Sequence, residues 1–169
     1  AAAHARLGEV KGKGAWVSID EAQAAEAKES EGQGKVYYGD GWVESAKAEA
    51  LREADRKPCG FEVAVRVNRP HVTLFSARAV LPSLRVADVL ESAVTTYRKQ
   101  MEGIWKLEDR KEPFRVYWFA DTASFQSVSA AQTGQPGPAG VAGFYDEKAR
   151  GLYLNPTTKD PERLGIPTA

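Results

Sequence analysis

Cysteine and histidine are scarce in this chain of 169 residues. Cys59 is the only cysteine, which excludes an intrachain disulfide and a cysteine-based metal cluster. The two histidines are His4 and His71, and neither is followed by a second histidine four residues later. The zinc-binding motif His-Glu-x-x-His is therefore absent. We expect no metal site, no cofactor and no catalytic activity from this chain alone, and we interpret His71 as a histidine at a strand edge.

The sequence also lacks an excess of charge and long apolar runs. Lysine plus arginine and aspartate plus glutamate both total 23, so the formal net charge is 0. We therefore expect no affinity for nucleic acid or for an anionic membrane surface. No segment approaches the roughly 20 apolar residues of a membrane span. The sequence opens with Ala1-Ala2-Ala3-His4 and no methionine, which suggests an exported protein after processing, although a truncated product would open in the same way.

Apolar residues make up 43% of the chain, enough for one packed domain and a smaller appendage. Residues 1–57 are the predicted appendage, and they contain a twofold repeat. The segments Gly14-Ala15-Trp16-Val17-Ser18 and Gly41-Trp42-Val43-Glu44-Ser45 each precede an Ala/Glu-rich run. Each repeat is typical of a hairpin followed by a helix, which we call a ββα unit, and Ser18 with Glu21 matches a capping box.

The composition changes at Arg56-Lys57-Pro58-Cys59-Gly60, where proline and glycine break the helical pattern. We place a boundary here, between residues 1–57 and residues 58–169, and expect few contacts across it. Cys59 would then lie in a boundary loop without a chemical role. We expect Trp16 and Trp42 to supply much of the appendage's core, and the alternative is that they form an aromatic binding surface.

The hydrophobic periodicity of the second part predicts an α+β fold. Apolar residues alternate over residues 61–67, which indicates a strand, and residues 71–75 are its expected hairpin partner. Residues 83–105 carry the apolar stripe of a long helix, and Ser83 is its expected cap. We expect this helix to pack across a mixed or antiparallel sheet.

The remaining elements follow the long helix. Apolar groups on both faces of residues 114–119 predict a central strand, after which Asp121 can cap a short helix. A Gly/Pro-rich connector over residues 134–140 leads to a hairpin that we expect to be formed by residues 141–145 and 151–155.

Several short motifs follow one another in this second part. They are His71-Val72-Thr73-Leu74-Phe75-Ser76, Leu90-Glu91 with Tyr97, Val116-Tyr117-Trp118-Phe119, Asp121 with Phe125, and Gly143-Phe144-Tyr145. In this order they resemble the N-terminal part of a bacterial gluzincin-like metallopeptidase domain of the zincin superfamily, which Trp-Val repeats can precede. The resemblance implies a following helix with His-Glu-x-x-His, whose histidines bind zinc while its glutamate activates water. This sequence contains no such helix, so zinc would require a segment downstream of it.

The resemblance also implies that an extended peptide adds to the sheet edge at the hairpin. Four residues could line such a cleft: Phe144, Tyr145, Tyr153 and Asn155. Strand alternation places half of them in the core. If the following helix does not cover the hairpin, we expect its apolar face to associate with a partner chain or a second copy.

Two functions are consistent with these observations. The first is the non-catalytic, substrate-side portion of a zinc metallopeptidase, with the zinc ligands on a missing segment. The second is a stand-alone binding or scaffold subunit that acts through the sheet edge or the tryptophan repeats in a larger assembly.

Overall fold

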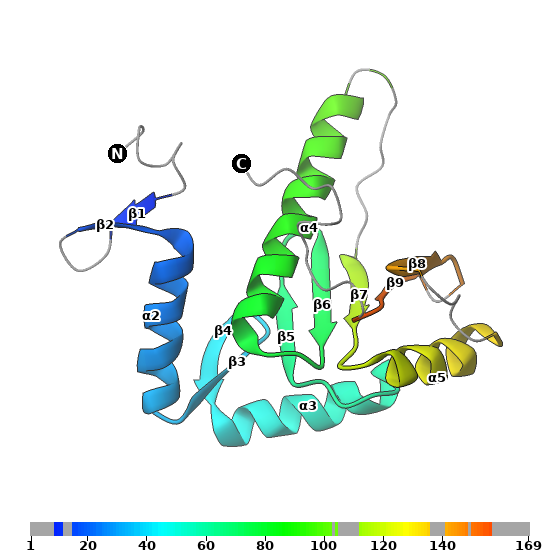
Figure 1. Cartoon of the computed structure of the whole chain (residues 1–169), viewed down its shortest axis with the longest axis horizontal. Helices are drawn as coiled ribbons and strands as arrows, with labels where there is room; N and C mark the ends of the chain where they lie inside the picture. Colours follow the sequence, from blue (N-terminus) through cyan, green and yellow to red (C-terminus); the bar gives the residue numbers. More distant parts are fainter. Residues whose placement is uncertain are drawn as a thin grey trace.

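The computed structural model describes residues 9–11, 15–102, 104, 112–135, 141–148 and 150–156. The fold is α+β, as predicted (Figure 1). Along the chain the described elements are β1 (Glu9–Lys11), β2 (Trp16–Ser18), α2 (Ile19–Gly32), β3 (Lys35–Tyr38), β4 (Gly41–Glu44), α3 (Ser45–Cys59), β5 (Val65–Asn68), β6 (Val72–Ser76), α4 (Val80–Met101), β7 (Phe114–Trp118), α5 (Thr122–Thr133), β8 (Gly143–Asp146) and β9 (Gly151–Leu154).

The two repeats are ββα units, as predicted. β1 pairs with β2 ahead of α2, and β3 pairs with β4 ahead of α3. The capping box of α2 is confirmed, because the Ser18 hydroxyl accepts the Glu21 N–H at 3.2 Å and the Glu21 carboxylate accepts the Ser18 N–H at 3.0 Å. Gly39 has φ +77° in the turn of the second hairpin, where a side chain would be strained. The corresponding turn of the first hairpin, residues 12–14, lies outside the described residues.

The third sheet has five strands in the order β5-β6-β7-β9-β8. β6, β7 and β9 are parallel to one another, whereas β5 and β8 run antiparallel to their neighbours. β7 is therefore the central strand, as its two apolar faces predicted. Val116 and Tyr117 lie on opposite faces of β7, and both are buried. The two hairpins predicted in this part are β5–β6 and β8–β9.

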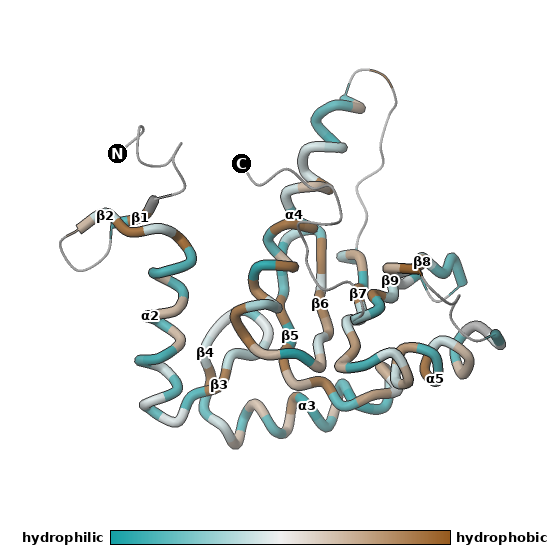
Figure 2. Tube along the Cα trace, viewed as in Figure 1, coloured by the Kyte–Doolittle hydropathy of each residue, from teal (hydrophilic) through white to brown (hydrophobic). Residues whose placement is uncertain are grey.

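Helices pack on both faces of the five-stranded sheet (Figure 1). α4 packs against β5 and β6 and closes one core around Leu74, Leu84 and Val116. α3 and α5 lie on the opposite face, where Phe119 and Phe125 belong to a second core. In Figure 2, β6 is largely hydrophobic and β5 alternates between hydrophobic and hydrophilic residues, whereas α2 is mostly hydrophilic. Burial of the strands, more than that of the helices, therefore supplies the apolar surface that stabilises the fold.

The long helix α4 begins at Val80 and not at the predicted Ser83. Pro82 does not prevent this earlier start, because the backbone N–H groups in the first turn of a helix form no intrahelical hydrogen bonds that a proline could remove. Ser83 is buried, and its hydroxyl lies 2.7 Å from the Ala79 carbonyl and 2.8 Å from the Ser76 hydroxyl. α4 ends at Met101, and Trp105, which we expected on its apolar stripe, lies outside the described residues. Among the described helices, none is both long and apolar enough to span a bilayer.

The boundary at residues 56–60 is not a helix break before Pro58, because α3 continues to Cys59. Pro58 costs the helix a single hydrogen bond near its end, and Gly60 then stops it in the left-handed conformation at φ +72°. Cys59 is buried in the second core, not in a loop, and burial raises the pKa of its thiol to about 12.

The expectation of few contacts across this boundary is also wrong. Tyr38, from the second ββα unit, shares a core with Tyr117 of the central strand. Gly39 donates its N–H to the Arg66 carbonyl at 2.8 Å and accepts the Asn68 N–H at 2.9 Å, so the β3–β4 turn covers the outer edge of β5. The second ββα unit therefore packs directly on the five-stranded sheet.

The tryptophans of the two repeats have different surroundings. Trp42 is half-buried and packs edge to face against Tyr37, with 5.5 Å between ring centroids. Trp16 is 38% exposed, so the expectation of core burial is wrong for it. Trp42 is covered because the turn of its hairpin bonds to the edge of β5, which brings the second unit onto the five-stranded sheet.

Candidate functional site

The first candidate site is the outer edge of β8. β8 pairs with β9 on one side, and within the described residues no strand pairs with its other side. The first residue of β8, Gly143, leaves no room for a side chain, because a Cβ there would lie 2.4 Å from the Tyr153 carbonyl oxygen. An edge strand is the part of a sheet to which an extended peptide binds through its backbone when it adds a strand.

Three of the four residues predicted to line this edge are structural. Phe144 stacks on Tyr153 with 5.0 Å between centroids. Tyr153 is fully buried and donates its hydroxyl proton to Gln132 at 3.1 Å, and burial raises its pKa to about 12. Asn155 is buried and donates its side-chain N–H to the Val141 carbonyl at 3.1 Å, which ties the end of β9 to the start of the hairpin.

Tyr145 is the predicted residue that remains available to a ligand, since it is 44% exposed. It lies on the opposite face of β8 from Phe144 and contacts Phe114 with 6.3 Å between centroids. The four residues therefore do not line one cleft. Tyr145 also borders an open depression at the β8–β9 turn, together with Glu147, Lys148 and Arg150.

The sheet face next to Tyr145 carries a half-buried apolar surface. α4 packs against β5 and β6, and Figure 1 shows β7, β9 and β8 to one side of it. On this face Phe114, Trp118, Leu152 and Leu154 are half-buried. The Arg78 guanidinium lies over the Trp118 ring, 5.4 Å from the ring centroid, which is a cation–π contact. We call the surface formed by Phe114, Trp118, Leu152, Leu154 and Tyr145 the β7–β9–β8 face.

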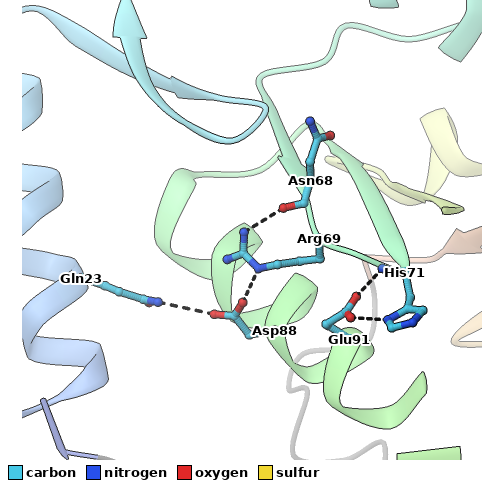
Figure 3. Close-up of polar contacts among 6 residues, drawn as sticks. All are labelled: Gln23, Asn68, Arg69, His71, Asp88 and Glu91. Carbon is cyan, nitrogen blue, oxygen red and sulfur yellow. Dashed lines mark hydrogen bonds and ion pairs between the residues drawn. The ribbon is translucent and has the colours of Figure 1, made fainter. Parts of the chain in front are cut away.

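A polar network connects α2 and the β5–β6 turn to α4 (Figure 3). Arg69 donates from Nε to Asp88 at 2.7 Å, and Gln23 lies 3.4 Å from the other oxygen of the same carboxylate. Burial alone would lower the pKa of Arg69, but its hydrogen bonds to Asp88 and Tyr37 outweigh that effect and raise it. Arg69 is therefore charged, and the Asp88 carboxylate compensates its charge.

The second part of Figure 3 is a pair formed by His71 and Glu91. The Glu91 carboxylate accepts the His71 backbone N–H at 2.9 Å and lies 2.5 Å from Nδ1 of the imidazole. Among the described residues, no group of three or more His, Cys, Asp or Glu side chains is placed to hold a metal ion. The pair joins the start of β6 to α4, and we assign it no catalytic role.

The second candidate site is a cavity of about 270 Å³ between α2, the β3–β4 hairpin and the start of α4. Tyr37 and Leu84 are its buried residues, and Trp42 adds a half-buried aromatic wall. Glu26 and Asp40 are exposed residues of its lining. Sequence reasoning singled out Trp42 but missed both carboxylates, because no motif connects a helix in the first repeat to a turn in the second.

Comparison with protein-family models, with curated proteins and with solved structures finds no significant match to this chain. The likeness to gluzincin-like peptidases consequently depends on the motifs quoted above and on their order alone.

Proposed function

We propose that this chain is the non-catalytic, substrate-side portion of a gluzincin-like zinc metallopeptidase. The observation that carries the proposal is the antiparallel strand β8, which ends the sheet with an outer edge unpaired within the described residues. An extended peptide can add to such an edge through main-chain hydrogen bonds. The order of the motifs from His71 to Tyr145 adds support, because it resembles the start of that peptidase domain.

The β7–β9–β8 face supports the same proposal. It has half-buried apolar residues beside α4, and a helix from a following segment would find there the apolar surface against which to pack. In the proposed protein that segment would carry the zinc ligands. The described residues of this chain do not fit a zinc site, because His71 is held by Glu91 and no third ligand lies near. We therefore assign no zinc chemistry to them.

The experiment begins with the gene sequence beyond the codon for Ala169. The proposal predicts His-Glu-x-x-His within about 40 residues, the reach of one further loop and helix. The longer product should hydrolyse a casein-derived peptide mixture and bind stoichiometric zinc, whereas the 169-residue chain should do neither. The matched control is the longer product with the motif glutamate changed to glutamine, which should bind zinc without hydrolysis. A stop codon directly after Ala169 would refute the proposal.

A stand-alone binding subunit is the second candidate, and the exposed residues of the first ββα unit favour it. Val10, Trp16 and Ile19 are 37%, 38% and 45% exposed, respectively. Tryptophan is enriched at interaction surfaces, so Trp16 is the residue of this unit that we expect to contact a partner. Under this hypothesis Trp16→Ala should abolish self-association or partner binding measured by light scattering, whereas Tyr145→Ala should leave it unchanged.

A further inference from the structure

The cavity between the two ββα units and α4 combines features that the proposed function does not use. Its volume of about 270 Å³ lies below the roughly 300–1,000 Å³ of sites for drug-sized ligands, so it suits a single side chain or a small amine. Its lining comes from α2, the β3–β4 hairpin, the β5–β6 turn and α4. These elements are fixed relative to one another by the contacts described above, so the cavity is already formed in the free protein.

The charges around the cavity favour a cation. Arg69 is its one lining cation among the described residues, and Asp88 compensates that charge at 2.7 Å. Glu26 and Asp40 remain, and within the described part of the chain neither side chain forms an ion pair or a hydrogen bond. Two uncompensated carboxylates therefore face one small space, and their joint field attracts positive charge.

The apolar lining favours an alkyl chain behind that charge. Tyr37 and Leu84 are buried, and Trp42 stands at 89° to the Tyr37 ring. Aromatic surfaces of this kind bind both methylene groups and ammonium heads. The cavity thus offers apolar contact for a short chain and carboxylates for its charged end.

We propose that this cavity binds an alkylammonium group, the chemistry of a lysine side chain, with Trp42 and Tyr37 against the alkyl chain and Glu26 and Asp40 near the ammonium. The group can come from a peptide or from a free amine. The proposal does not depend on the peptidase assignment, because none of these residues belongs to the β8 edge or to the β7–β9–β8 face.

The test measures the indole N–H signals of ¹⁵N-labelled protein, which has four tryptophans. Trp42→Phe identifies the Trp42 signal by its loss. The probes are n-butylammonium and the blocked tripeptide acetyl-Ala-Lys-Ala-amide. Matched uncharged probes are n-butanol and the same tripeptide with norleucine, and butyrate is the anionic control. We expect at least one ammonium probe to shift the Trp42 signal saturably, with weaker binding at high salt, and the uncharged and anionic probes to give no saturable shift. Binding of the tripeptide identifies a peptide ligand, and binding of n-butylammonium alone identifies a free amine.

Conservative variants then locate the charge. Glu26→Gln and Asp40→Asn should each weaken binding by about 2–5-fold, the range for one exposed charge pair, and together by roughly the product. Glu31→Gln is the matched control on α2, since Glu31 is exposed and does not line the cavity, and it should bind like the parent. Three results would each overturn the proposal: equal binding of n-butanol and n-butylammonium, unchanged binding in the double variant, or no saturable shift with either ammonium probe.

Discussion

Asp55, on α3, forms one of the polar contacts that join the second ββα unit to the main sheet. Its carboxylate accepts hydrogen bonds from the Tyr38 hydroxyl on β3 and from Nη1 of Arg66 on β5, both at 2.8 Å. The side chains of Asp55 and Arg66 are 15% and 23% exposed, so the pair is largely shielded from water. Arg66 also lies over the Tyr38 ring at 5.1 Å, and its Nε has no hydrogen-bond partner among the described residues.

Asp55→Ala should therefore lower the free energy of unfolding by about 2–4 kcal/mol. Removing one partner of a buried ion pair costs about 3–5 kcal/mol, and partial exposure of this pair reduces that cost. The lost hydrogen bond from Tyr38 adds about 1 kcal/mol. Tyr38→Phe removes only the hydroxyl and should cost about 1 kcal/mol, which separates the two contributions. The loss expected for Asp55→Ala is a large fraction of the total free energy of unfolding of a domain, which is about 5–15 kcal/mol.

The assay is urea unfolding followed by circular dichroism, with the free energy obtained by linear extrapolation. Glu53→Ala is the matched control on the same helix, because Glu53 is 75% exposed and lies 3.8 Å from Arg56. It should change stability by no more than about 0.5 kcal/mol. If the free energies of unfolding of Asp55→Ala and of this control differ by less than about 0.5 kcal/mol, the network does not hold the second ββα unit to the sheet and the reasoning fails.

Three further predictions concern packing, pH and the domain boundary. Gly151→Ala should destabilise the protein by about 1–3 kcal/mol, because its Cβ would lie 2.6 Å from the Tyr117 ring, whereas Gly32→Ala, with nothing within 4 Å, should be neutral or stabilising; equal urea midpoints would contradict this. Cys59 and Tyr153 have pKa values raised from 9.0 and 10.0 to about 12, so the unfolded chain loses these protons first and stability should fall as the pH rises from 9.0 toward 12; a urea midpoint independent of pH over that range would show that the two groups are not buried. A chain that starts at Pro58 should lose cooperative unfolding, because Tyr38 and Ala48 belong to the second core; a sharp transition in that chain would support an independent domain over residues 58–169.

The candidate site was only partly predictable from sequence. The pattern of residues 141–145 and 151–155 predicted the hairpin and named Tyr145, which is exposed beside a sheet edge that no described strand pairs with. The same pattern also named Tyr153 and Asn155, which are buried. Alternation along a strand predicts that neighbouring residues face opposite sides of the sheet, but it does not predict which side is covered. The cavity near Trp42 was not predictable, since Glu26 and Asp40 line the same space only after α2 has packed against the second unit.

Local chemistry is what the sequence determined by itself. The capping box at Ser18, the cap at Asp121 and the two-faced strand around Val116 depend on residues within a few positions of one another, so short patterns predicted them. Tertiary structure decided the rest. α3 continues through Pro58 to Cys59, whose burial offsets one lost hydrogen bond, and the Ser83 hydroxyl bonds to Ser76 on β6 instead of capping α4. These outcomes depend on contacts between segments far apart in the chain, and no local pattern records such contacts.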